Sequence, residues 1–150
     1  MKFVDSVKIH VRSGNGGSGC TSFRREKYIP QGGPDGGDGG KGGDVFLFGD
    51  KSKNTLLDLS FQQHQHAENG KNGGGSDKHG RNGKDLHILV PLGTVAKIDE
   101  TGEVLQEVIE KKDYLVFSGG RGGRGNSRFK SATNRNPDYH QPGNPGTEVW

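Results

Sequence analysis

The sequence predicts an all-β protein in which short strands form a barrel or sandwich and glycine-rich segments project from this base. Three observations support this fold class. Glycines recur at every third residue, which is the period of a polyproline II helix and not that of an α-helix or a strand. Short apolar stretches alternate with these segments and show no convincing helical periodicity. Glycine supplies 28 of the 150 residues and the hydrophobic class only 27%, so a compact core must come from part of the chain.

The apolar stretches are expected to form the base, over residues 1–12, 44–68, 85–118 and 147–150. Alternation in Phe3–Val11 predicts a half-buried strand, and Val45–Phe48 predicts a short apolar strand. The turn-forming run Asp99–Gly102 predicts a hairpin between its flanking stretches. The remaining strands are expected at Leu56–Phe61 after a turn near Asp50–Asn54, at Leu86–Val90, at Thr94–Ile98, at Val104–Val108 and at Tyr114–Ser118.

The glycine-rich segments are expected to form the projection, over residues 13–43, 69–84 and 119–146. A flexible linker needs many glycines but no period, whereas these glycines are spaced so that extended segments can pack without side chains between them. At about 3.1 Å per residue, a run such as Gly32–Gly43 would extend roughly 37 Å. The glycines to which we assign this packing role are Gly33, Gly36, Gly37, Gly39, Gly40, Gly42, Gly43, Gly80, Gly83, Gly119, Gly122 and Gly125.

Charge is divided unevenly along the chain, although the net charge is only +3. The glycine-rich stretches 70–84 and 119–146 are basic, and the strand-rich stretch 86–118 is acidic. This separation predicts a polyanionic partner for the glycine-rich end. The candidate RNA-binding residues are Arg24, Arg25, Lys27, Tyr28, Lys78, Arg81, Arg128, Lys130 and Arg135.

Two of the basic stretches have alternative interpretations. In Phe23–Pro30, guanidinium groups could pair with phosphates and aromatic rings could stack on bases, or Phe23 and Tyr28 could anchor a loop that carries ordinary surface charges. Gly119–Gly125 resembles an RGG segment that binds single-stranded nucleic acid. Its period favours a structural role for the glycines, with Arg121 and Arg124 solvated, and the two interpretations are compatible.

The sequence contains no recognisable catalytic or cofactor site. No GxxxxGK is followed by Ser or Thr, so no P-loop is present and this chain is expected neither to bind nor to hydrolyse GTP. His64 and His66 share one face of a strand, but a metal site needs more ligands, and we expect none. The single cysteine, Cys20, and the lack of a signal peptide or a long apolar run predict a cytoplasmic protein without membrane attachment.

Several long motifs resemble the amino-terminal domain of the Obg (CgtA) family of GTPases. The matching stretches are Met1–Asp5, Gly19–Pro30, Gly32–Gly40, Gly83–Asp85, Val90–Thr94, Gly125–Ser131 and Gly143–Gly146. The resemblance implies the Obg fold, a β-barrel base that carries six polyproline II helices. It implies a role in late assembly of the large ribosomal subunit, in which the domain enters the peptidyl-transferase region and mimics the acceptor end of a tRNA. It also implies that a GTPase domain, with GTP and Mg²⁺, follows this domain in the parent protein and is absent from this chain.

Two classes of function follow from these observations. The favoured one is an rRNA-binding domain that docks on the large subunit through its basic projection. The alternative is a protein-interaction domain that gathers regulators or stress-signalling proteins through its acidic base. Salt dependence separates them, because contacts with phosphates weaken steeply as salt rises.

Overall fold

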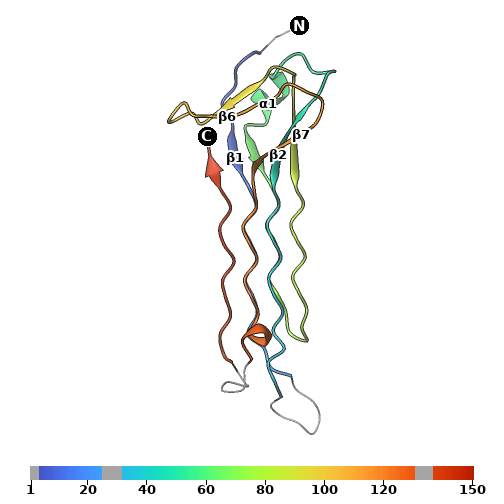
Figure 1. The fold of residues 1–150 in the computed structure, drawn as a ribbon, viewed down its shortest axis with the longest axis vertical. Helices are drawn as coiled ribbons and strands as arrows, with labels where there is room; N and C mark the ends of the chain where they lie inside the picture. The colour runs from blue at the N-terminus through green and yellow to red at the C-terminus, as the bar shows by residue number, and fades with distance from the viewer. Residues whose placement is uncertain (1–3, 25–31, 131–136) are drawn as a thin grey trace.

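The structure is a computed structural model that describes residues 4–24, 32–130 and 137–150. Figure 1 shows the strands gathered at one end of the molecule, which we call the base. Long extended segments run side by side away from the base, and we call these the projection. The short 3₁₀ helix η1 (Asn126–Phe129) lies at the far end of the projection, which we call the tip.

The central sheet of the base has the strand order β4-β2-β7. Strand β2 (Val45–Gly49) pairs in parallel with β4 (Leu86–Val90) and antiparallel with β7 (Asp113–Phe117). Alternate residues of β2 and β4 point into the core, as the alternation of apolar residues in β4 predicted. Among the described residues, the buried hydrophobic side chains are those of Val45, Leu47, Ala67, Ile88, Val90 and Val108.

Two smaller sheets complete the base. Strand β1 (His10–Arg12) lies between β3 (His64–His66), to which it is parallel, and β8 (Glu148–Val149), to which it is antiparallel. Strands β5 (Val95–Lys97) and β6 (Val104–Glu107) form the predicted hairpin. Gly102, in the connecting turn, has a φ of +74°, which a side chain would disfavour.

The all-β class is confirmed, but three expectations about the base need correction. Residues described by the structure form three small sheets and no closed barrel. The expected strand at Leu56–Phe61 is instead the short helix α1 (Leu57–Phe61), and the expected strand at Phe3–Val11 is reduced to β1. The α1 sequence places leucines at alternate positions, but Leu57 and Leu59 are only half-buried, so alternation there does not report a sheet face.

Backbone hydrogen bonds link the extended segments at every third residue. The N–H groups of Gly14, Gly17 and Cys20 donate to successive carbonyls of the 35–43 segment, with N···O distances of 2.8 to 3.0 Å. The N–H groups of Gly37, Gly40 and Gly43 in turn donate to the 68–74 segment. Within the described residues, the segments joined by this pattern are 13–20, 35–43, 68–74, 78–84, 119–126 and 141–146.

Glycine is required by the close approach of these segments. A Cβ built at Gly39 would overlap the carbonyl group of Gly17, and one at Gly122 would overlap that of Gly39. Comparable overlap with a neighbouring backbone occurs at every glycine to which we assigned a packing role except Gly33. A Cβ at Gly33 would meet only the Lys130 ammonium nitrogen, at 3.7 Å, which is an ordinary contact.

Candidate nucleic-acid interface

In the 78–84 segment, residues three apart lie on the same side, so the segment has three rows of side chains. Each row has a different environment. Gly80 and Gly83 face carbonyl groups of the 68–74 segment. His79 and Asn82 lie against the 35–43 segment, where His79 Nδ1 and Asn82 Oδ1 accept backbone N–H groups at 3.0 and 2.9 Å. Two of the three rows are therefore used for packing and hydrogen bonding inside the projection.

The third row of this segment consists of Lys78, Arg81 and Lys84, and all three residues are exposed. Arg81 Nη2 lies 4.0 Å from Glu68 Oε1, which is a long ion pair, and the Arg81 side chain keeps 70% of its surface accessible. Pairs of this kind contribute little and are easily exchanged for another anion. The outward row is thus a line of solvated positive charge along one edge of the projection, which we call the basic row.

Arg128 lies at the tip, where it is tied to Asp38. Its Nη2 and Nε atoms lie 2.7 and 2.9 Å from Asp38 Oδ2. The other carboxylate oxygen of Asp38 accepts the Gly125 N–H group at 2.9 Å. Burial raises the pKa of Asp38, but the hydrogen bonds from Gly125 and Arg128 outweigh it and hold the pKa below 3.8. The predicted RNA-binding residue Arg128 therefore also joins the 35–43 segment to the tip.

A buried amide holds the tip together. The Asn126 side chain is fully buried, and its Oδ1 atom accepts the Gly36 N–H group at 2.8 Å. Its Nδ2 atom donates to the carbonyls of Ser22 and Pro137, each at 2.9 Å. One side chain thus fixes three chain segments, which gives the basic residues nearby a rigid support.

Two further predicted RNA-binding residues lie among the residues that the structure describes. Arg24 and Lys130 are exposed. The predicted contacts that lie outside the described residues are Arg25, Lys27, Tyr28 and Arg135.

Further exposed cations share the three-residue spacing but were not assigned as RNA contacts from the sequence. They are Lys71, Lys84, Arg121 and Arg124. The signal that identifies them is the position of each residue relative to the glycines. In a segment whose glycines face the neighbours, the residue on the remaining side must face solvent. In the Gly119–Gly125 stretch, the glycines therefore pack against neighbouring segments while Arg121 and Arg124 stay accessible. The structural and the RGG interpretations of this stretch are thus compatible.

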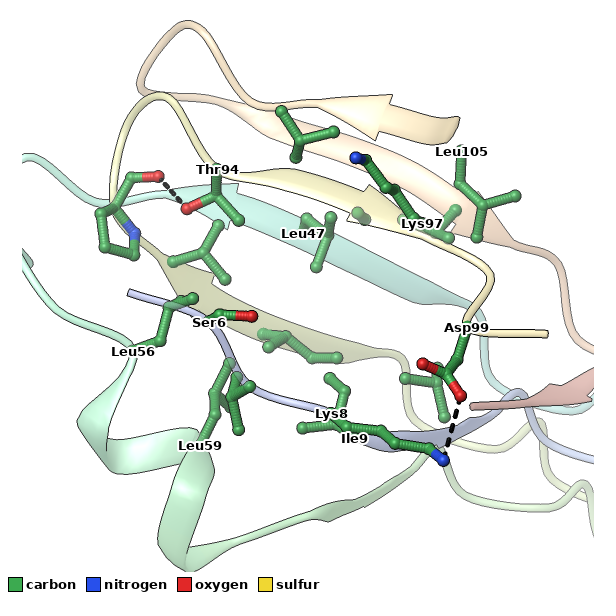
Figure 2. Close-up of a pocket in the computed structure, with 18 of the residues that line it drawn as sticks. Ser6, Lys8, Ile9, Leu47, Leu56, Leu59, Thr94, Lys97, Asp99 and Leu105 are labelled. Atoms are coloured by element: carbon green, nitrogen blue, oxygen red, sulfur yellow. Dashed lines mark hydrogen bonds and ion pairs between the residues drawn. The ribbon is translucent and has the colours of Figure 1, made fainter. Parts of the chain in front are cut away.

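The base contains an apolar cavity of about 760 Å³ between α1, β1, β2 and the β5–β6 hairpin. Figure 2 shows Ile9, Leu47, Leu56 and Leu59 around it, with the Lys8–Asp99 ion pair (3.0 Å) at one side. The lining is chiefly aliphatic and suits packing against an apolar group.

Among the described residues, no helix is long and apolar enough to cross a membrane.

Comparison with known proteins gives one consistent result. A family model described as GTP1/OBG matches residues 4–150. The protein "GTPase Obg" from Persephonella marina is 56% identical over 151 aligned residues, which cover 100% of this chain and 44% of that protein. "GTPase Obg" from Syntrophus aciditrophicus is 55% identical with the same coverage, and that from Syntrophotalea carbinolica is 54% identical, with 42% of its length covered. The chain aligns with the amino-terminal part of these relatives and spans less than half of their length.

Proposed function

The chain belongs to the GTP1/OBG family, and from that membership we propose that it is the ribosome-docking, rRNA-binding domain of a larger GTPase. The parent protein acts in late assembly of the large ribosomal subunit. The domain inserts its glycine-rich projection near the peptidyl-transferase region, with rRNA as its partner. GTP and Mg²⁺ belong to a separate GTPase domain, which is the second partner of this one.

The projection is a bundle of six polyproline II helices in this proposal. Its support is the repeat of backbone hydrogen bonds at every third residue, together with the overlap that a Cβ would cause at the packed glycines. A polyproline II helix has three residues per turn and no internal hydrogen bonds, so its N–H and C=O groups are available to neighbouring helices. Bonds to those neighbours make the projection stiff enough to enter a confined site.

The observation that carries the proposal is the basic row on this support. With a rise of about 3.1 Å per residue, Lys78, Arg81 and Lys84 stand roughly 9 Å apart along one edge. All three residues are exposed, and the only ion pair that the row makes with described residues is the long Arg81–Glu68 pair, while the nearby Asp38 is engaged by Arg128. A row of exposed cations on a thin rod suits an RNA-walled channel, since each phosphate that a cation neutralises releases counterions and so favours binding.

Cosedimentation with purified large ribosomal subunits over a salt series tests this function. We expect binding that weakens steeply with salt and that falls in the triple variant Arg24→Ala, Arg25→Ala, Lys27→Ala. The matched control replaces three cations of the base, Lys97, Lys111 and Lys112, with alanine and is expected to bind like the parent. Binding lost in the base variant and kept in the variant of Arg24, Arg25 and Lys27 would refute docking through the projection.

A specific feature of the base favours the second candidate function, a protein-interaction domain for regulators or stress-signalling partners. Large apolar side chains are exposed there, with Phe61, Ile109 and Val104 at 78%, 65% and 56% accessible. Exposed apolar side chains of this size suit a protein partner better than RNA. The replacement of Phe61 and Ile109 with serine should abolish such an interaction and leave ribosome binding unchanged.

A further inference from the structure

Three histidines from strands β1 and β3 lie close together in the base. His64 and His66 lie on the same face of β3, and the parallel pairing of β1 with β3 places His10 directly opposite His64. One ring nitrogen from each lies within 4.8 Å of the others. The pairing of two strands far apart in the sequence thus supplies a third ligand, which the spacing of His64 and His66 alone could not reveal.

The hydrogen bonds of His10 orient its ring for metal binding. His10 Nε2 lies 2.8 Å from Glu148 Oε1, and a carboxylate oxygen can only accept, so Nε2 carries the proton. In the neutral imidazole, Nδ1 therefore holds a lone pair, and it faces His66 Nε2 at 2.8 Å. A ligating histidine whose other nitrogen donates to a carboxylate is the usual arrangement at protein metal sites.

We propose that His10, His64 and His66 form a Zn²⁺ site of the base, with His10 Nδ1 and His66 Nε2 as ligands and one coordination position open. At Zn–N distances of 2.0–2.1 Å, tetrahedral ligand nitrogens lie about 3.3 Å apart. The His10–His66 pair is already close to that separation. The His64 and His66 side chains are exposed, and His66 reaches the ligating form by moving its proton from Nε2 to Nδ1.

The choice of metal class follows from the donor set. Three imidazoles without a thiolate, and with a single carboxylate bound behind one of them, suit borderline ions such as Zn²⁺, Co²⁺ and Ni²⁺ and not Mg²⁺ or Ca²⁺. Bound metal would connect β1 to β3. Because these strands pair in only three positions, the base should become more stable when the site is filled.

Trp150 makes the site directly measurable. It is the only tryptophan of the chain, and its ring centroid lies 5.1 Å from that of His10 and 5.8 Å from that of His64. Titration of the untagged chain with Co²⁺ should quench its fluorescence to saturation near one ion per chain, with the visible absorption of a tetrahedral cobalt site. Excess Zn²⁺ should restore the fluorescence, and Mg²⁺ should have no effect.

Variants of the two exposed ligands test whether these residues bind the metal, because their substitution should not unfold the protein. His64→Gln and His66→Gln should each weaken Co²⁺ binding at least tenfold, while the unfolding temperature of the metal-free protein stays within a few degrees. Glu148→Gln should weaken binding by about 10-fold to 100-fold and alter the cobalt spectrum, because Glu148 positions His10 and does not itself bind the metal. His87→Ala, which removes an exposed histidine elsewhere in the base, is the control and should bind like the parent.

Two results would overturn the proposal. One is the absence of saturable quenching by Co²⁺ in the parent chain at millimolar concentration. The other is quenching that survives in a double His64→Gln, His66→Gln variant or disappears in His87→Ala, since either result would place the bound ion elsewhere.

Discussion

At the residue scale, glycine and asparagine have complementary tasks in the projection. Glycine allows two backbones to approach until a Cβ would overlap a carbonyl group, as at Gly39. Asparagine supplies an acceptor where a backbone N–H group has no neighbouring carbonyl, as when Asn69 and Asn72 accept the Asn15 and Ser18 N–H groups, each at 2.9 Å. Extended segments can therefore satisfy their polar groups without forming a sheet.

Gly39→Ala tests the packing of the projection. The added methyl group would overlap the Gly17 carbonyl and force two segments apart, so we expect a loss of about 1–3 kcal/mol or more in the free energy of unfolding. Gly74→Ala is the matched control, because its Cβ would only contact Lys78 Cβ at 3.7 Å. Chemical denaturation should show the control to be neutral or slightly more stable, since alanine restricts the unfolded chain. Equal stability of both variants would exclude tight packing at Gly39.

Asp38 and Asp44 make stability depend on pH. Burial raises the pKa of each carboxyl, but hydrogen bonds from Arg128 and Gly125 to Asp38, and from Lys41 and Gly119 to Asp44, hold both pKa values below 3.8. A carboxyl with a lowered folded-state pKa stabilises the protein above its unfolded pKa, and this contribution is lost as pH falls. The unfolding temperature should therefore drop as pH falls from about 5 to about 3. A double Asp38→Asn, Asp44→Asn variant should show a weaker dependence, and an unchanged pH profile would contradict the assignment.

At the scale of the elements, the basic row belongs to one segment and can be removed without disturbing its packing. Lys78, Arg81 and Lys84 occupy the side of the 78–84 segment that faces neither neighbour. Their side chains are consequently the part of the segment that is available to a partner. Substitution of these three residues therefore changes the charge of the projection without changing its packing.

The triple variant Lys78→Ala, Arg81→Ala, Lys84→Ala should bind large subunits more weakly and with a shallower salt dependence. Each phosphate contact contributes about 0.7 to 0.9 to the slope of log affinity against log salt, so we expect the slope to fall by roughly 2. The measurement is cosedimentation at several salt concentrations, with thermal unfolding as the check on folding. A parallel downward shift with the parent slope would mean that the row makes no phosphate contacts.

Local sequence patterns predicted two kinds of element. These are strands whose pairing partner is near in the sequence and strands whose residues alternate between buried and exposed. β4 and the β5–β6 hairpin were predicted because alternation and the Asp99–Gly102 turn are local signals. Helix α1 was missed because five residues with alternate leucines resemble a strand, and no cap or longer period identifies a single turn. The proximity of His10 to His64 and His66 could not be predicted, because it depends on a parallel pairing between distant strands.

The candidate interface was predictable to a similar extent. The basic character of the glycine-rich end follows from composition, and the three-residue period identifies the glycines that face their neighbours, with Gly33 as an exception. The engagement of Arg128 by Asp38 required the structure, because these residues lie in different segments. The same holds for Asn126, whose buried amide joins segments that are distant in the sequence.

At the scale of the whole molecule, the two ends have different surfaces. The projection presents exposed cations between glycines, and the base presents an apolar cavity with exposed Phe61 and Ile109. This separation would allow one end to bind RNA while the other contacts a protein.

GTP turnover should be absent from the purified chain. No GxxxxGK in the sequence is followed by Ser or Thr, and the glycine-rich segments use their N–H groups to bind one another. A phosphate-release assay with the chain at high concentration should match the buffer blank. Turnover that follows the protein through a further purification step would contradict this prediction.

The position of the chain on the large ribosomal subunit tests the central claim most directly. We would determine it by cryo-electron microscopy of the chain bound to purified large subunits at low salt. The account predicts that the projection lies among rRNA near the peptidyl-transferase region, with the basic row against phosphates and the base outside. A map in which the base contacts the subunit while the projection extends into solvent would contradict the account.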